Sequence, residues 1–215
     1  RKNTFLLALY SFSRGFYVHL HLFNKYICTM VYVFLANGFE DIEGLAPVDI
    51  LRRGGVEVKT VGIMGSEYVE TAHGVTLKAD VKFEDIDNFD DADLLLLPGG
   101  MPGSLHLKNH KGVCDALEEQ NEKGKYIGAI CAAPMVLGKL GILEGKKATC
   151  YPGFEKYLDG AEYTADMVTV DGNIITGRGP AAAMPYGYAL LSLFVGRDDV
   201  KSIEDGMIYT QLMQK

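Results

Sequence analysis

The sequence lacks the charge pattern of a nucleic-acid-binding protein. No run of Lys or Arg is longer than two residues, and the chain carries 28 acidic against 21 basic side chains, a formal net charge of −7. Proteins that bind nucleic acids gather positive charge on one face to meet the phosphates. We therefore expect an acidic protein that binds no nucleic acid.

Cysteine is scarce, and its spacing excludes several kinds of site. No two cysteines form a CxxC pair, so the sequence predicts no disulfide framework, redox dithiol or metal site. It also has no P-loop and no dinucleotide-binding fingerprint, and we expect no cofactor. So few cysteines fit a reducing compartment such as the cytoplasm, where each thiol is either buried filler or individually reactive. The four are Cys28, Cys114, Cys131 and Cys150.

Residues 1 to 29 differ in composition from the rest of the chain. They contain four Lys or Arg and no acid. The apolar stretch "FLLALY" is interrupted by polar residues, has no small-residue cleavage site after it, and is too short to cross a membrane. We interpret residues 1–29 as an extension that is non-native, targeting or disordered. We expect residues 30–215 to form a single domain with no membrane association.

The remaining sequence alternates between apolar runs and segments with helical spacing. Strands are predicted at "VYVFLA", "VEVKTVG", "DLLLL", "YIGAI" and "KKATC", helices over residues 40–55, 113–123, from near 131 and over 186–195, and a hairpin at 170–173. This order is typical of right-handed βαβ units. The predicted fold class is therefore α/β, a flavodoxin-like sandwich with a mostly parallel central sheet covered by helices on both faces.

The stretch "IGAICAAPM" places Cys131 where a strand changes to a helix. The small residues that follow suit a tight turn, a nucleophile elbow that presents the side chain at its apex. A helix N-terminus contributes roughly 0.3 to 1 kcal/mol, less than the ~1.4 kcal/mol of one pKa unit, so Cys131 needs a further donor to become a thiolate. A packed, unreactive cysteine is about equally consistent with this stretch alone, and for Cys114 packing is the favoured interpretation.

Two further turns carry residues suited to such a site. Gly99 and Gly100 follow the leucine strand and leave bare backbone N–H groups that can form an oxyanion hole, although glycine turns after strands are common. Glu40, Asp41 and Glu43 follow the first strand, and an acid kept protonated by burial could donate to a thiolate. Acids are also ordinary in the first turn of a helix, so this alternative stays open.

A last turn, "GRGP" at residues 177–180, offers Arg178. Its guanidinium could anchor an anion or the backbone. A helix start with proline near its first position explains the motif nearly as well.

Four motifs together resemble one known family. "ANGFEDIEGLAPVDILRRGG", "LLLLPGGMPG", "IGAICAAPM" and "GRGP", in this order, resemble the ThiJ/PfpI superfamily, and within it the branch of the Parkinson's-disease protein deglycase and its bacterial relatives. The resemblance covers residues 30–215. It implies that Cys131 is the nucleophile, that Glu43 is the buried partner of its sulfur and a proton shuttle, and that Gly100 and Ala132 lie among the backbone donors.

Two positions depart from patterns in the family. The peptidase-like branch has a histidine directly after the nucleophile, where this chain has Ala132, so a cysteine peptidase or amidase is disfavoured. The human relative has a histidine near the cysteine where this chain has Tyr151. Tyr151 can donate a hydrogen bond but cannot act as a base near neutral pH, which leaves Glu43 for proton transfer.

The resemblance implies a cofactor-independent glyoxalase or deglycase. Its substrates would be 2-oxoaldehydes such as methylglyoxal, or their early adducts on amines and thiols, with Tyr151 and Arg178 lining the site. The alternative is a redox-sensing or chaperone-like stress protein that uses oxidation of Cys131. A homodimer is implied as well.

Overall fold

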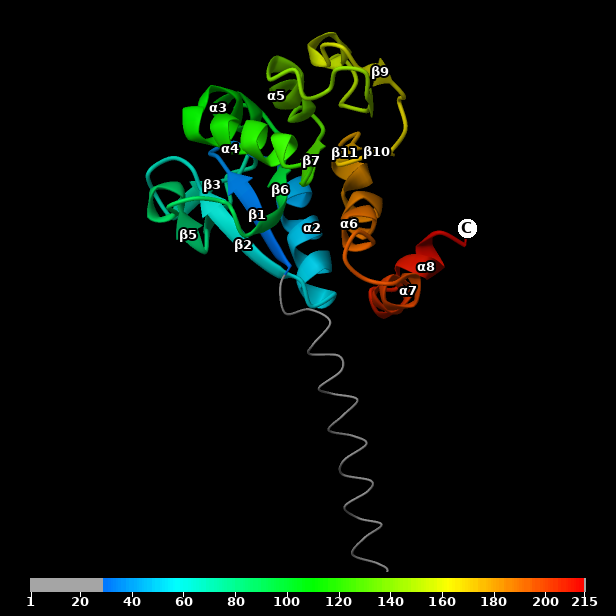
Figure 1. Ribbon diagram of the computed structural model, residues 1–215. Helices are drawn as coiled ribbons and strands as arrows, with labels where there is room; N and C mark the ends of the chain where they lie inside the picture. Colours follow the sequence, from blue (N-terminus) through cyan, green and yellow to red (C-terminus); the bar gives the residue numbers. More distant parts are fainter. Residues whose placement is uncertain (1–28, 215) are drawn as a thin grey trace, which may run out of the picture.

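Seven strands form the central sheet of the computed structural model, which describes residues 29–214 (Figure 1). All neighbouring strands are parallel except β10 and β11, which form the hairpin predicted at residues 170–173. The interpretation of residues 1–28 lies outside the described residues. In spatial order the strands are β10 (Val168–Asp171), β11 (Ile174–Gly177), β7 (Tyr126–Ile130), β6 (Ala92–Leu97), β1 (Met30–Leu35), β2 (Glu57–Gly62) and β5 (Val81–Lys82).

The two most apolar strands lie at the centre of the sheet. All six residues of β1 are buried, and β6 is buried along nearly its whole length. The two strands pair directly, with Val31 opposite Leu94. A strand without alternating polar residues must be covered on both faces, which explains why these apolar runs occupy the middle of a helix-covered sheet.

Helices cover both faces of the sheet and enclose two cores. One core includes side chains of α3 (Gly103–Asn109), α4 (Lys111–Glu122) and α5 (Pro134–Lys139). The other includes side chains of α2 (Asp41–Arg53) and α6 (Ala183–Leu191), which lie side by side in Figure 1. Within residues 29–214, no helix has both the length and the apolar character needed to span a bilayer. The mostly parallel α/β architecture predicted from the sequence is confirmed.

Smaller elements complete the described chain. β3 (Tyr68–Glu70) and β4 (Thr76–Lys78) form an antiparallel pair, and β8 (Lys147–Ala148) and β9 (Glu162–Tyr163) form a parallel one. Three 3₁₀ turns are η1 (Phe83–Asp85), η2 (Glu155–Tyr157) and η3 (Pro180–Ala182). After α6, the chain continues through α7 (Arg197–Gly206) and α8 (Tyr209–Leu212).

Several local predictions need correction. The helix expected from near Cys131 begins at Pro134, so Cys131 lies in the preceding turn. The strand at "KKATC" is only two residues long and lies outside the central sheet, because side chains bind backbone N–H groups in it and directly after it: Lys147 N donates to Asp171 and Thr149 N donates to Thr176. α3, α7 and α8 were not predicted.

Candidate active site

The candidate site lies at the carboxyl ends of four adjacent strands. Glu43 follows β1, Gly99 and Gly100 follow β6, Cys131 follows β7, and Arg178 follows β11. These strands are neighbours in the order β11-β7-β6-β1, so their ends meet at one edge of the sheet. Open α/β sheets bind ligands at this edge.

Cys131 occupies a strained turn directly after β7. Its backbone φ of 63° lies in the left-handed region, which residues other than glycine rarely adopt. Two backbone hydrogen bonds hold the turn: Cys131 N donates to Gly177 O at 2.8 Å, and Cys131 O accepts from Tyr151 N at 2.9 Å. The side chain is 8 % exposed, and the cysteine is free. The turn therefore fixes the thiol at the end of the strand.

Glu43 is the most deeply buried of the three acids that follow β1. It lies in the first turn of α2, is 2 % exposed, and its backbone N–H donates to the Glu40 carboxylate at 2.8 Å. Neither of its own carboxyl oxygens completes a hydrogen bond with a described residue. The pKa of Glu43 is raised to about 7, chiefly by burial; the Cys131 thiol and the Gly99 amide oppose the rise, and the Glu40 charge adds to it. Glu43 is thus poised to change protonation near neutral pH.

The Cys131 thiol is shifted toward its protonated form. Burial raises its pKa above the ordinary value of 9.0, and the nearby Glu43 charge raises it further. The backbone N–H groups of Gly100 and Ala132 act in the opposite direction because they favour the thiolate. When Cys131 and Glu43 share a single proton, they therefore hold it tightly. The thiolate of Cys131 forms when that proton moves to Glu43.

Two glycines let the backbone pass between these groups. A Cβ on Gly99 would lie 2.4 Å from Glu43 Oε2 and 2.6 Å from Cys131 Cβ. Gly100 has a φ of +88°, and a Cβ there would lie 2.4 Å from Glu40 N. The Gly99 amide interacts with Glu43, whereas the Gly100 amide faces the sulfur.

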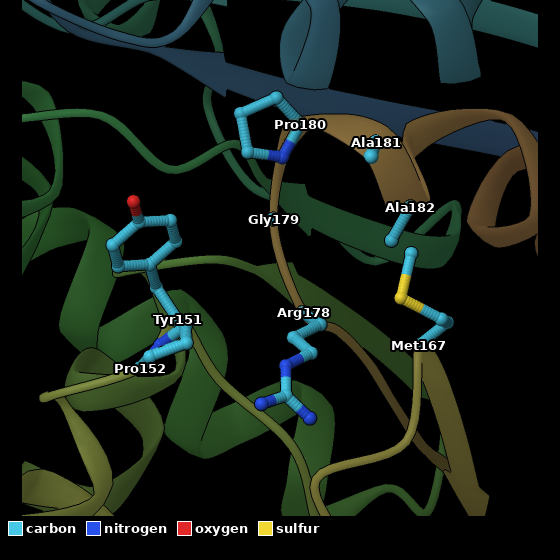
Figure 2. A pocket seen from close by; sticks show the side chains of 8 residues that line it. All are labelled: Tyr151, Pro152, Met167, Arg178, Gly179, Pro180, Ala181 and Ala182. Carbon is cyan, nitrogen blue, oxygen red and sulfur yellow. The ribbon is translucent and has the colours of Figure 1, made fainter.

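Tyr151 and Arg178 line a neighbouring pocket of about 180 Å³ (Figure 2). Figure 2 shows the Tyr151 ring and the Met167 side chain on opposite sides of this pocket. The Arg178 backbone N–H donates to Met167 O at 3.0 Å, and its guanidinium donates to Ala165 O. The fold thus brings both sequence-predicted lining residues to one cavity beside the Cys131 turn.

Sequence reasoning missed one polar cluster next to the site. This cluster consists of Glu40, Asp41 and His73. Each residue has one atom that could bind a metal ion, and these atoms lie within 4.8 Å of one another. Asp41 already accepts hydrogen bonds from the Thr71 hydroxyl at 2.7 Å and pairs with His73 Nδ1 at 2.6 Å. Internal hydrogen bonding therefore accounts for the cluster. His73 lies 32 residues from Asp41, so no local spacing could have linked the two.

Comparison with known proteins shows which family this chain resembles. The model of the DJ-1/PfpI family matches residues 29–193. A crystal structure of Drosophila melanogaster DJ-1beta is 35 % identical, with a TM-score of 0.80 over 84 % of this chain and 97 % of that one. The Caenorhabditis elegans glutathione-independent glyoxalase DJR-1.2 is 32 % identical over 76 % of this chain and 87 % of its own length. The deglycase PH1704 of Pyrococcus horikoshii is 36 % identical over 68 % of this chain and 87 % of its own length.

Other relatives are much longer. The DJ-1 homolog B of Arabidopsis thaliana is 36 % identical over 81 % of this chain, but the match spans only 40 % of that protein, and for homolog A it spans 44 %. The chain thus corresponds to less than half of these two plant proteins. Extent of match and similarity of fold nevertheless agree with the resemblance of the four motifs, and the chain belongs to the DJ-1/PfpI family.

Proposed function

We propose that the protein is a cofactor-independent glyoxalase or deglycase. Its substrates would be 2-oxoaldehydes such as methylglyoxal, or the early adducts of these compounds on amines and thiols. The observation that carries the proposal is the pairing of Cys131 with a buried carboxyl, Glu43, whose pKa is about 7. The names of two relatives, a glyoxalase and a deglycase, support the same chemistry.

The first step is addition of the thiol to the aldehyde. The Cys131 sulfur forms a bond to the aldehyde carbon while its proton moves to Glu43, and the carbonyl oxygen becomes an oxyanion. The N–H groups of Gly100 and Ala132, which favour the thiolate form of Cys131, would stabilise that oxyanion. Glu43 then returns the proton to the oxygen, which gives a hemithioacetal.

The second step moves a proton between adjacent carbons. Glu43 removes the proton from the carbon bonded to sulfur and delivers it to the neighbouring carbonyl carbon, while the hydroxyl proton of the hemithioacetal moves to the oxygen of that carbonyl, which leaves a thioester of a 2-hydroxy acid. Water then hydrolyses the thioester, releases the acid and restores the thiol. A carboxyl with a pKa of about 7 suits both directions of this transfer, because it gives and takes a proton with similar ease.

Lactate production from methylglyoxal tests this reaction. We expect the wild type to form lactate, and Cys131→Ser and Glu43→Gln to lose at least about a hundredfold in rate, since each removes a group that transfers a proton or forms the covalent bond. Cys114→Ser is the matched control because Cys114 is buried within α4 and its sulfur is close to the carbonyl of Lys108. Equal rates in the wild type, Cys131→Ser and Glu43→Gln would contradict the proposal.

A homodimer is part of the proposal. Ile42 and Leu45 are exposed on α2, beside the first-turn residue Glu43. Apolar side chains gathered on one helix face favour association with a second copy. Analytical ultracentrifugation would show about twice the monomer mass, and Leu45→Lys would lower it; a monomer at high concentration would contradict this part.

A second candidate function is redox sensing through Cys131. The observation that favours it is that the Gly100 and Ala132 N–H groups act to lower the pKa of Cys131, since donors that favour a thiolate would also stabilise the charge of a sulfinate. Mild hydrogen peroxide supplies the oxidant. Mass spectrometry should then find oxidation at Cys131 before Cys114 and Cys150, and unselective oxidation would contradict this function.

A further inference from the structure

Two backbone segments at the pocket that contains Arg178 are hydrogen-bonded to Cys131. Tyr151 on one wall donates its backbone N–H to Cys131 O, and Gly177, directly before Arg178, accepts from Cys131 N. The cavity of about 180 Å³ has room for roughly six water-sized groups at about 30 Å³ each. A small organic acid has this size, and the backbone of one lining residue, Tyr151, is hydrogen-bonded to the backbone of Cys131.

Arg178 is held in place but has free hydrogen-bond donors. Its backbone N–H donates to Met167 O, and one guanidinium N–H donates to Ala165 O. Among residues 29–214 no carboxylate forms an ion pair with this guanidinium, although its charge contributes to lowering the pKa of Glu155, whose carboxylate accepts chiefly from Gly153 N. A fixed guanidinium without an ion-pair partner offers a planar fork that matches a carboxylate.

The rest of the pocket is mainly apolar. The walls are the Tyr151 ring, Met167, Pro180 and the small side chains of Ala181 and Ala182, as Figure 2 shows. Arg178 is the only charged residue among those that line it. Apolar walls around a single cation strengthen its attraction for an anion and leave little else to recognise.

We infer that Arg178 binds the carboxylate of small 2-hydroxy acids, which makes this pocket the product-anion subsite of the Cys131 site. The choice of acid rests on the proposed function, because hydrolysis of the thioester creates a carboxylate at the carbon that was bonded to Cys131. Tyr151 contributes a wall of the pocket, and the carboxylate leaves Glu43 for the charged residue of the pocket lining, Arg178.

Equilibrium binding tests this inference without turnover. Isothermal titration calorimetry would measure lactate and its uncharged analogue lactamide on Cys131→Ser protein. We expect lactate to bind about tenfold more tightly than lactamide, and Arg178→Met in the same background to raise the Kd for lactate about tenfold. Arg197→Met, which removes an arginine from the first turn of α7, is the matched control and should leave the Kd unchanged.

A second measurement needs no change at Arg178, whose loss also removes the bond to Ala165. Salt of about 1 M shortens the Debye length to about 3 Å, so it should weaken lactate binding severalfold and leave lactamide binding unaffected. Equal affinities for lactate and lactamide, an unchanged Kd in a folded Arg178→Met variant, or no lactate binding would overturn the inference.

The outcomes also separate this inference from the proposed reaction. If Cys131→Ser protein binds lactate through Arg178 while the wild type makes no lactate from methylglyoxal, the subsite stands and the proposed reaction fails. If the wild type turns over methylglyoxal but lactate does not bind, the inference alone fails.

Discussion

Glu43 and Cys131 approach each other across Gly99, and the space between them admits no side chain. A Cβ on Gly99 would lie 2.4 Å from Glu43 Oε2 and 2.6 Å from Cys131 Cβ. The thiol and the carboxyl come from segments 88 positions apart in the chain (131 minus 43). Their contact therefore depends on how the ends of β1, β6 and β7 meet.

Gly99→Ala should disrupt the site. The added methyl group overlaps Glu43 Oε2, Cys131 Cβ and Ile130 O, so the backbone or both side chains must move. We expect a loss of about 1 to 3 kcal/mol in the free energy of unfolding, measured by urea denaturation, and a large loss of any Cys131-dependent activity. Gly206→Ala is the control because nothing lies within 4 Å of its added Cβ. Wild-type activity in Gly99→Ala would show that the contact is not required.

The backbone strain at Cys131 predicts an unusual order of two variants. Glycine normally destabilises a protein relative to alanine, but a φ of 63° favours glycine. We expect Cys131→Gly to be more stable than Cys131→Ala by about 1 kcal/mol in urea denaturation. The opposite order would mean that the turn relaxes when the thiol is removed.

Stability should depend on pH through Glu43. Burial raises its folded-state pKa to about 7 from the ordinary 4.5, so the folded protein holds this proton more tightly than the unfolded chain does. The carboxyl therefore destabilises the fold progressively as pH rises from about 4.5 to about 7, and by a constant amount above that.

Glu43→Gln removes this titration. Relative to the wild type, we expect the variant to gain about 2 to 3 kcal/mol in the free energy of unfolding between about pH 5 and about pH 8. Glu118→Gln, at an exposed position of α4, should show no such trend. A stability difference that stays constant with pH would contradict the raised pKa.

The thiol itself should stay protonated at neutral pH. Burial and the Glu43 charge both raise the pKa of Cys131, so the ultraviolet thiolate absorbance of the wild type, minus that of Cys131→Ser, should show no step near pH 7. Glu43→Gln removes the negative charge and should lower the pKa of the thiol. A full thiolate step near pH 7 in the wild type would place the proton on Glu43 instead.

The central strands could be predicted because the apolar composition of a few neighbouring residues indicates burial on both faces. "VYVFLA" and "DLLLL" contain no polar alternation, and both became central strands. The strand predicted at "KKATC" was mostly wrong because the side chains of Asp171 and Thr176, more than 20 residues away, accept hydrogen bonds from the backbone of Lys147 and Thr149. α3 was missed because it begins within the glycine- and proline-rich turn "PGGMPG".

For the site, local sequence predicted the tight turn at Cys131, whereas the family resemblance predicted the roles of individual residues. A strand followed by small residues and a proline indicated a tight turn at Cys131, and the turn is present, although the helix begins three residues later. The roles of Cys131, Glu43, Gly99, Gly100 and Ala132 remain predictions. What the structure adds is that these residues meet at the ends of three neighbouring strands, with Gly99 between Glu43 and Cys131.

The sequence by itself determined the alternation of strands and helices and the position of the tight turn, because hydrophobic period and small-residue turns act over a few neighbouring residues. Apart from the family resemblance, only the tertiary structure decided which of Glu40, Asp41 and Glu43 is most deeply buried. Asp41 is partly exposed and hydrogen-bonded to Thr71 and His73, whereas Glu43 is enclosed by distant segments. The pKa values of Glu43 and Cys131 follow from that enclosure, since loss of water around a charge depends on every segment that packs against it.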